Sequence, residues 1–479
     1  MNLLNPLDAS FVRMESKRTP MHVAGLMIFQ LPDDAPPDYL SELFAYMRSR
    51  PVINPPYNWR LKPGRRARLM PQWEEAREID IDYHLRHSAL PHPGGERELG
   101  VLISRLHSIP MDMTKPLWEC HLIEGLENRR FAVYQKAHHS AVDGFSAIKM
   151  MNNWLSDDPH EATDAGPWSL PQPARKTSVP KNVNANDMVK NALTISGKNL
   201  QGSLKLVKKM REMARTADNP HGGLPNLLDI PRTIFNGRIT KHRRVATQWI
   251  EMERARAISK AAGTTVNDVC LAVLGGALRR YLDEQRALPD KTLYASVPIG
   301  LPHLNDKPGN RVVGFVCPMG THLSNPAERL SYINATTSDT KAKMASLPNE
   351  ALNQYSVIGI GPMMLGQMTG LSQKLPPMFN VTVSNVIAAK KPLYFRGSQM
   401  EAIYPVSLLF DGHTLNVTIV GYADRILFGI VGCRDTIPNL QRIAVYVRDA
   451  LDDLQSAVEA PKPRRKTASV RKKKTAAKA

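Results

Sequence analysis

The stretch RFAVYQKAHHSAVDGFSAIKMMNNWL, residues Arg130–Leu155, contains two kinds of hydrophobic pattern and indicates which fold the chain adopts. Its first part, RFAVYQKAHH, is a mostly apolar run with the length of a buried β-strand. After Asp143-Gly144 the apolar residues recur at the spacing of one helix face. They are Ala147, Ile148, Met151, Trp154 and Leu155. The stretch therefore predicts a strand, a loop with His138 and His139, and then a helix.

Other stretches of the first half have the hydrophobic patterns of buried and of half-exposed strands. Residues Met21–Gln30 and Leu117–Leu126 have the apolar runs of buried strands. Residues Glu78–His87 alternate between apolar and polar and predict a half-exposed strand.

The second half shows a similar mixture. TTVNDVCLAVLGGALRRYL is an apolar helix that Thr264 or Thr265 can cap. Residues 378–433 contain strand-like runs, which predict a β-meander with a turn at Asp411-Gly412. Because both halves combine strands and helices, we expect an α/β fold with mixed sheets.

At 479 residues the chain exceeds the usual size of one hydrophobic core, so two domains are expected. We predict an N-terminal domain at residues 1–155 and a C-terminal domain at 241–458. Residues 156–240 begin rich in Pro, Ser and charge and become amphipathic, which predicts a linker followed by connector helices. The amphipathic part is compatible with packing on the protein and with a membrane surface. Residues 459–479 are predicted to be a disordered basic tail.

The net charge of +19 is unevenly distributed. Between Lys462 and Lys478 the tail holds nine Lys and Arg residues and no acid. Such a segment cannot fold alone, so a solvated tail and an electrostatic anchor to anionic lipid are both open. Aromatic residues make up 6% of the chain, and no basic strand set laced with aromatics is present in the sequence. We therefore expect no specific nucleic-acid partner, and a non-enzymatic, basic-tailed nucleic-acid-binding protein is kept as the alternative.

Cysteine usage and hydropathy indicate the compartment. The cysteines Cys120, Cys270, Cys317 and Cys433 are widely spread and form no CxxC pair. This usage is typical of a reducing compartment and predicts neither a disulfide framework nor a structural zinc site. No apolar run approaches the roughly 18 residues that a membrane helix needs, and the first residues lack a signal-peptide layout. We expect a cytoplasmic protein.

His138 and His139 could be metal ligands, packed residues or a catalytic base. Adjacent side chains of a strand point to opposite faces and the usual ligand spacings are missing, so no metal site is expected. The GxSxG nucleophile elbow is absent from the sequence, which argues against a serine hydrolase. A base without a protein nucleophile would activate a hydroxyl group on a bound substrate. Asp143 would then fix the loop, and Gly144 would allow a backbone angle or close approach that other residues resist.

HHxxxDG, here His138 to Gly144, resembles the signature of the CoA-dependent acyltransferase superfamily. Within it, further stretches resemble the bacterial wax ester synthase/diacylglycerol acyltransferase family, in that family's order and over nearly the whole chain except the linker and tail. They are LDASFVRMES…TPMH (Leu7–His22), PLWE (Pro116–Glu119), Asn267-Asp268, NVTVSNV (Asn380–Val386) and FGIVGCRD (Phe428–Asp435). The combination is far more specific than HHxxxDG alone.

The resemblance implies two chloramphenicol-acetyltransferase-like domains with an active-site tunnel at their interface. It implies that His139 is the general base, which takes the proton from a long-chain fatty alcohol or from diacylglycerol. The hydroxyl then attacks the thioester of acyl-CoA in a ternary complex, and no cofactor is needed besides acyl-CoA as co-substrate. Asn267, at a helix start beside Asp268, would donate a hydrogen bond to the oxyanion.

The remaining motif residues have supporting roles in this scheme. His138 would pack inward, Asp143 would hold the loop through an arginine, and Ser384 and Asn385 match a motif near the domain interface. Because both acceptors are nearly insoluble in water, the implied enzyme would contact a membrane or lipid-droplet surface peripherally. A catalytically weak, lipid-binding relative is the alternative within the same family.

Two departures from the family pattern bear on substrate preference. The family usually continues SNV with Pro-Gly-Pro, whereas this chain has Ile387-Ala388-Ala389. Where relatives carry Pro-Val followed shortly by Arg, this chain has Pro298-Ile299-Gly300-Leu301-Pro302. Both changes are expected to reshape the tunnel or the CoA entrance.

Overall fold

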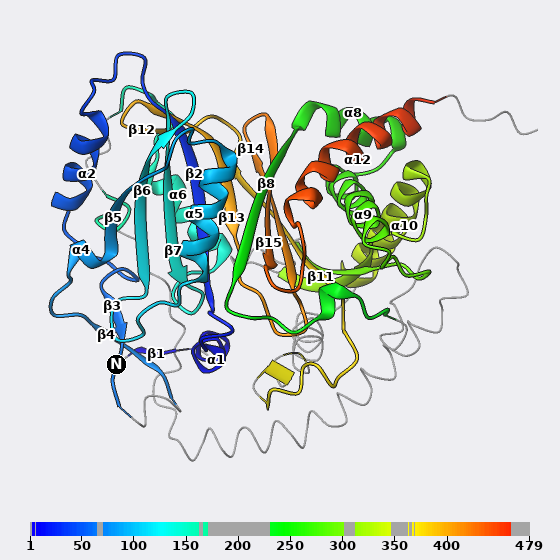
Figure 1. Cartoon of the computed structure of the whole chain (residues 1–479), viewed down its shortest axis with the longest axis horizontal. Coiled ribbons are helices and arrows are strands. Elements are labelled where there is room, and N and C mark those ends of the chain that lie inside the picture. The colour runs from blue at the N-terminus through cyan, green and yellow to red at the C-terminus, as the bar shows by residue number, and fades with distance from the viewer. Residues whose placement is uncertain are drawn as a thin grey trace, which may run out of the picture.

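Two mixed six-stranded sheets lie side by side in the structure, a computed structural model, and they confirm the α/β fold class (Figure 1). The structure describes residues 2–4, 6–64, 70–161, 166–170, 230–300, 312–345, 363, 366–367 and 369–460. Most of the predicted linker and connector, residues 171–229, and nearly all of the basic tail, residues 461–479, lie outside the described residues. The predicted tunnel likewise stays a prediction, because 301–311 and most of 346–368 also lie outside them.

The first sheet contains the strand of the stretch quoted above. Its order is β12-β13-β2-β7-β6-β5, and only β5 and β6 run parallel. The bounds are β2 (His22–Gln30), β5 (Leu85–Ala89), β6 (Trp118–Leu126), β7 (Arg130–His138), β12 (Tyr394–Phe395) and β13 (Ser398–Val406). The three predicted strands that became β2, β6 and β7 are confirmed. The helix predicted after Asp143 is confirmed as α6 (Gly144–Trp154).

The strand predicted at Glu78–His87 is wrong over most of its length. Residues Ile81–His84 form the short helix α4, and β5 begins only at Leu85. Asp80 caps α4, since its carboxylate accepts the Tyr83 N–H at 3.3 Å. A side-chain cap favours helix at this point, and a short alternating pattern does not distinguish the two states.

The second sheet has the order β10-β9-β11-β14-β15-β8. The bounds are β8 (Arg243–Glu251), β9 (Tyr294–Gly300), β10 (Val312–Pro318), β11 (Val381–Ala389), β14 (Leu415–Tyr422) and β15 (Arg425–Cys433). Four helices gather on the side of this sheet away from the first sheet (Figure 1). They are α8 (Met252–Ala262), α9 (Val266–Glu284), α10 (Pro326–Ala345) and α12 (Gln441–Glu459).

Both faces of the second sheet are covered by apolar side chains. On β14, Ile419 belongs to the core beneath the four helices, and the next residue, Val420, belongs to the core of the first sheet. The two halves of the chain therefore share a hydrophobic core. Within the described residues no single helix is long and apolar enough to cross a membrane; the pair α8 and α9, bent by 102°, meets the length and composition only together.

The predicted β-meander is wrong, because its strands divide between the two sheets. β11 pairs in parallel with β14, whereas β13 crosses over and pairs antiparallel with β2 of the first sheet. The crossing is tight: a Cβ on Gly429 of β15 would lie 2.0 Å from the Pro405 carbonyl oxygen of β13. The turn predicted at Asp411-Gly412 is present, since the His413 N–H donates to the Phe410 carbonyl at 2.9 Å and these two residues form an antiparallel bridge. The strands on either side of it, β13 and β14, belong to different sheets. Hydrophobic patterns predict burial but not the partner strand, so the crossing was not visible in the sequence.

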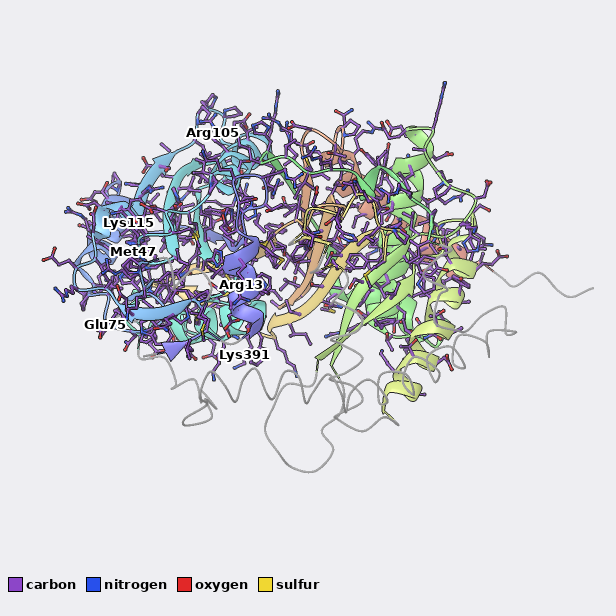
Figure 2. The ribbon with its side chains drawn as sticks, turned by 90° about the horizontal axis from the view of Figure 1, so that it is seen from below. Arg13, Met47, Glu75, Arg105, Lys115 and Lys391 are labelled. Atoms are coloured by element: carbon purple, nitrogen blue, oxygen red, sulfur yellow. The ribbon has the colours of Figure 1, made fainter. Side chains whose placement is uncertain are left out.

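Two helices connect the sheets at the level of the motifs. Helix α5 (Glu96–Ser108) lies between the first sheet and β8, and its Ser104 Oγ accepts the Val245 N–H at 2.9 Å. Helix α6 packs beside β11, where Asn152 Nδ2 donates to the Ala388 carbonyl at 2.9 Å. Figure 2 shows Arg105 of α5 and Lys391, which follows β11, on opposite faces of the molecule.

Candidate active site

His138 is the last residue of β7 and is completely buried, at 0% exposure. The Ser140 backbone N–H donates to His138 Nδ1 at 3.2 Å, and Ser140 Oγ lies 2.7 Å from the same atom. Because Nδ1 accepts a backbone N–H, the ring proton of the neutral imidazole belongs on Nε2. Nε2 lies 3.4 Å from Glu15 Oε2. Nδ1 therefore accepts a hydrogen bond, whereas Nε2 is buried beside Glu15 without forming one.

His139 has a different environment. Its backbone N–H donates to the Met21 carbonyl at 2.8 Å, and its half-buried ring stacks on Phe11 with centroids 4.3 Å apart. Burial lowers the pKa of His139, and the negative charge of Asp143 opposes this shift only in part. Nδ1 is buried without a hydrogen-bond partner. A neutral imidazole at pH 7 is able to accept a proton.

One segment near the N-terminus holds both histidines. We call Phe11, Glu15 and Met21 the N-terminal clamp. Phe11 lies on α1 (Pro6–Met14), and Glu15 directly follows this helix. The Met21 N–H donates to Glu15 Oε2, so the clamp is also bonded internally. The sequence marks this segment as a family motif but gives its residues no role, because the contacts with β7 are long-range.

Asp143 lies at the start of α6 and acts as its N-cap. Its carboxylate accepts the Ser146 N–H at 2.7 Å. Within the described part of the chain no arginine pairs with Asp143, so the arginine contact implied by the family is not seen. Gly144 has no left-handed φ, and a Cβ there would meet nothing within 4 Å. Neither reason predicted for this glycine applies in the structure.

The first turn of α9 carries Asn267. Asn385 Nδ2 of β11 donates to Asn267 Oδ1 at 2.8 Å, which occupies the amide oxygen and leaves the Asn267 NH2 group as a donor. The helix N-terminus adds a partial positive charge at this point. Thr265 caps the helix, as predicted for Thr264 or Thr265, because its hydroxyl accepts the Asp268 N–H at 3.2 Å. Ser384 is half-buried in β11 opposite Thr418.

Asp268 is fully buried and faces the helix pair α9 and α10. It accepts from Thr265 N–H at 3.0 Å, Thr265 Oγ1 at 2.7 Å, Asn334 Nδ2 at 2.9 Å and Thr337 Oγ1 at 2.7 Å. Burial alone would raise the pKa of Asp268, but the hydrogen bonds from Thr337, Asn334 and Thr265 lower it. The carboxylate is therefore ionised and fully engaged within the protein, which leaves none of its oxygens for a substrate.

A buried ion pair supports the strand behind the histidines. Lys136 Nζ lies 2.9 Å from Glu119 Oε2 and also donates to the Leu106 and Ile109 carbonyls at the C-terminal end of α5. Burial alone would raise the pKa of Glu119, but His121 and Lys136 lower it to about 2. Glu119 ends the PLWE motif. Its role was not predicted, because its pairing with Lys136 depends on the register of β6 against β7.

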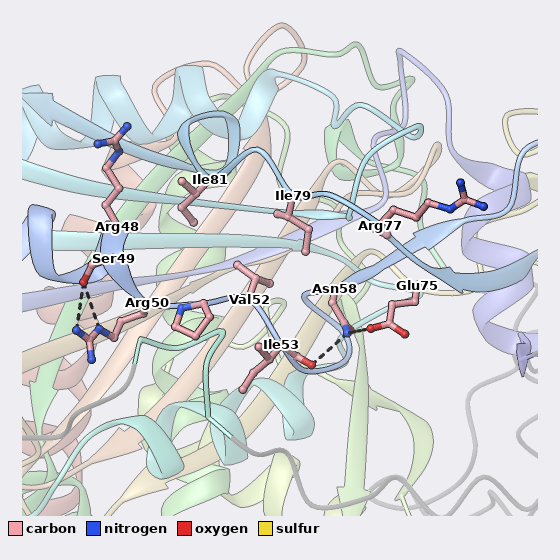
Figure 3. A pocket seen from close by; sticks show the side chains of 12 residues that line it. Arg48, Ser49, Arg50, Val52, Ile53, Asn58, Glu75, Arg77, Ile79 and Ile81 are labelled. Carbon is pink, nitrogen blue, oxygen red and sulfur yellow. Dashed lines mark hydrogen bonds between the residues drawn. The ribbon is translucent and has the colours of Figure 1, made fainter.

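The structure therefore brings the predicted residues together in two groups. His138, His139, Asp143 and Gly144 lie at the end of β7, in the loop that follows it and at the start of α6. Asn267 of α9 contacts Asn385 of β11. The contact between Asn152 and Ala388 joins α6 to β11. A cavity of about 500 Å³ lies elsewhere, near α2 (Tyr39–Ser49), and none of the predicted site residues lines it (Figure 3). The described residues include no group of three or more His, Cys, Asp or Glu side chains able to hold a metal ion.

Comparison with family models gives two matches that cover most of the chain. The wax ester synthase/diacylglycerol acyltransferase catalytic domain matches residues 4–270, and the WS/DGAT C-terminal domain matches residues 308–455.

Individual relatives extend this result. A Mycobacterium tuberculosis protein named as a diacylglycerol O-acyltransferase is 42% identical over 457 residues, covering 95% of this chain and 99% of its own length. The solved wax ester synthase/diacylglycerol acyltransferase from Marinobacter aquaeolei VT8 is 36% identical, with a TM-score of 0.77, and the match covers 96% of this chain and 100% of that one. The first condensation domain of the calcium-dependent antibiotic synthetase shares only the fold, at 14% identity and a TM-score of 0.56 over 96% of both chains.

Proposed function

Since the chain belongs to the wax ester synthase/diacylglycerol acyltransferase family, we propose that it moves a long-chain acyl group from acyl-CoA to a fatty alcohol, to diacylglycerol, or to both. The observation that carries the proposal is the environment of His139, a half-buried ring held neutral at the end of β7. The names of the mycobacterial relatives favour diacylglycerol as an acceptor, and that of the Marinobacter protein also includes wax ester synthase, which favours a fatty alcohol as well.

In the proposed reaction His139 acts as the general base in a ternary complex. It takes the proton of the acceptor hydroxyl as the oxygen attacks the thioester carbonyl. The tetrahedral intermediate then collapses, the C–S bond breaks, and the CoA thiolate takes the proton back from the His139 imidazolium. The products are the oxygen ester and free CoA, so atoms and charge balance without an external oxidant or reductant, and no further cofactor is needed.

The amide of Asn267 is the proposed donor to the oxyanion. Asn385 Nδ2 donates to the Asn267 amide oxygen at 2.8 Å. This hydrogen bond orients the Asn267 side chain so that its NH2 group points away from Asn385. A preorganised donor of this kind stabilises charge that develops only in the transition state. His138 and the N-terminal clamp position the loop and take no part in proton transfer.

The mechanism needs no acyl-enzyme. Ser140, the hydroxyl nearest to the histidines in sequence, is 1% exposed, and its Oγ lies 2.7 Å from His138 Nδ1. It is therefore unable to reach a substrate without leaving that partner. Intact-mass analysis after mixing with acyl-CoA alone should show no covalent adduct.

Both acceptors are nearly insoluble in water, so the proposal includes a peripheral position of a cytoplasmic enzyme at the inner membrane or at lipid inclusions. The decisive experiment supplies palmitoyl-CoA with either hexadecanol or a diacylglycerol, follows thiol release, and separates the lipids. Formation of wax ester or triacylglycerol that disappears in His139→Ala supports the proposal. Absence of either ester from the folded wild-type protein would favour a lipid-binding relative without catalysis.

A further inference from the structure

The cavity near α2 combines arginine side chains with aliphatic ones. We call it the arginine groove. It has a volume of about 500 Å³ and is lined by Arg48, Arg50, Arg77, Val52, Ile53 and Ile79, among others. Figure 3 shows Arg48 and Arg50 at one end and Arg77 at the other, with the aliphatic side chains between them. An amphiphilic lining of this kind fits an amphiphilic ligand.

The charges in the arginine groove favour an anion. Arg48 forms a two-point ion pair with Asp82, with distances of 2.6 and 2.7 Å. Among the described residues, Arg50 and Arg77 have no carboxylate partner. Glu75, the acid in the lining, lies within 3.2 Å of Asn58 Nδ2, which donates to it. Arg50 Nε and Nη2 donate to Ser49 Oγ at 3.3 and 3.2 Å, and neither bond neutralises the guanidinium charge. Arg50 and Arg77 therefore keep their positive charges, and guanidinium matches the geometry of a phosphate.

The apolar part of the groove is exposed. Ile53 is 56% exposed, whereas Val52, Ile79 and Ile81 are partly buried beneath it. A large aliphatic side chain between cationic groups is typical of a surface that enters the region between lipid headgroups and acyl chains.

The arginine groove is connected to the catalytic loop through a small sheet. This sheet has the order β1-β4-β3, with bounds Asn2–Leu3, Gln72–Glu75 and Trp59–Leu61. Trp73 of β4 packs in one apolar cluster with Leu117 and with Ala141 of the histidine loop. A surface bound at the groove would therefore lie on the side of the domain that carries this loop.

We propose that the arginine groove is a docking site for anionic phospholipid at a bilayer or lipid-inclusion surface. The arginines at the two ends of the groove attract anionic headgroups, and Ile53 between them enters the upper part of the acyl layer. Near an anionic surface each arginine contributes attraction that falls off within a Debye length. This docking is separate from acyl transfer and is measured without acyl-CoA, so its failure leaves the proposed reaction untouched.

The test is co-sedimentation of the full-length protein with two kinds of vesicle, phosphatidylcholine alone and phosphatidylcholine mixed with phosphatidylglycerol. Arg77→Gln should weaken binding to the anionic vesicles roughly fivefold and leave binding to neutral vesicles unchanged. Ile53→Ser should weaken binding to both. Both variants alter exposed side chains, and thermal melting verifies that they are folded.

Matched controls come from the exposed face of α5, which lies far from α2 and β4. Figure 2 shows Arg105 well away from Met47 and Glu75, which mark those elements. Arg105→Gln and Val101→Ser should bind vesicles like the wild-type protein. The proposal is overturned if Arg77→Gln and Arg105→Gln behave alike. It is also overturned if Arg77→Gln loses binding of inorganic phosphate in solution but keeps wild-type binding to the anionic vesicles, because the groove would then take a soluble phosphate and not a lipid.

Discussion

The loop after β7 and the first turn of α9 both carry proposed catalytic groups, but contacts of different range hold their backbones. The histidine loop depends on the N-terminal clamp, which is distant in sequence, and on hydrogen bonds through Met21 and Glu15. The backbone at the start of α9 is held by a local cap between Thr265 and Asp268, and only the Asn267 side chain depends on a distant residue, Asn385. A base must be neutral when it takes the proton, and an oxyanion donor must point at the developing charge, so each region has to hold its group in a fixed place.

The largest effect is expected on the histidine loop. His139→Ala should lower kcat by roughly 100- to 10,000-fold, because a positioned general base contributes about that much. His160→Ala, which alters an exposed histidine, should leave kcat unchanged. Turnover near that of the wild type in a folded His139→Ala protein would remove the general-base assignment.

The matching change at α9 is Asn267→Ala. Loss of one oxyanion donor should lower kcat by roughly 100- to 1,000-fold with little change in KM. Asn385→Ala should have a smaller effect of the same kind, because Asn385 orients the Asn267 amide and does not touch the substrate. An increase in KM alone would show that Asn267 binds the ground state.

Asp268→Asn should lower stability more than catalysis. The variant places a donor where Thr265 and Asn334 now donate to a carboxylate, at a cost of about 2–3 kcal/mol in the free energy of unfolding. Thr337→Val removes one of the same hydrogen bonds and should cost about 1 kcal/mol. Urea denaturation measures both. Lost activity at unchanged stability would instead give Asp268 a direct role at the substrate.

Acid should destabilise the first sheet and the start of α9 in different pH ranges. Burial lowers the pKa of His107, behind the first sheet, to about 3, so the folded protein keeps it neutral where the unfolded chain protonates below about 6.5. The free energy of unfolding should therefore fall by about 1.4 kcal/mol per pH unit from pH 6.5 toward 3 for this group. Asp268, whose pKa is lowered from 3.8, loses its contribution only below that value.

Hydrogen exchange measured by mass spectrometry between pH 7 and 4 locates this loss. Peptides from the first sheet should lose protection before those from the start of α9. His107→Gln should reduce the slope of stability against pH. A slope equal to that of the wild type would mean that His107 is not the group responsible.

The smallest effect concerns the cap of α6. Asp143→Ala removes the acceptor of the Ser146 N–H and should cost about 1 kcal/mol, whereas Asp143→Asn keeps a good cap and should cost little. Thermal melting measures the difference. A large loss of activity in Asp143→Asn at unchanged melting temperature would indicate that the charge of Asp143 acts on His139.

Local features of this chain could be predicted from its sequence, and long-range ones could not. The change of period in Arg130–Leu155 predicted β7, the loop and α6, and the Thr265 cap marked the start of α9. The stacking of Phe11 on His139, the pairing of Glu119 with Lys136 and the crossing of β13 depend on which elements meet in space. Hydrophobic period determines which face is buried but carries no information about its partner.

The crossing of β12 and β13 has a consequence for biosynthesis. Until residues 394–406 leave the ribosome, β2 is the outermost strand of the first sheet, with its hydrogen-bonding edge unpaired. β2 is also largely apolar on both faces, and such an edge is a template for aggregation. The strands of the first half are therefore translated well before β12 and β13 can complete their sheet. We expect the product of a shortened gene ending after α6 to depend on chaperones.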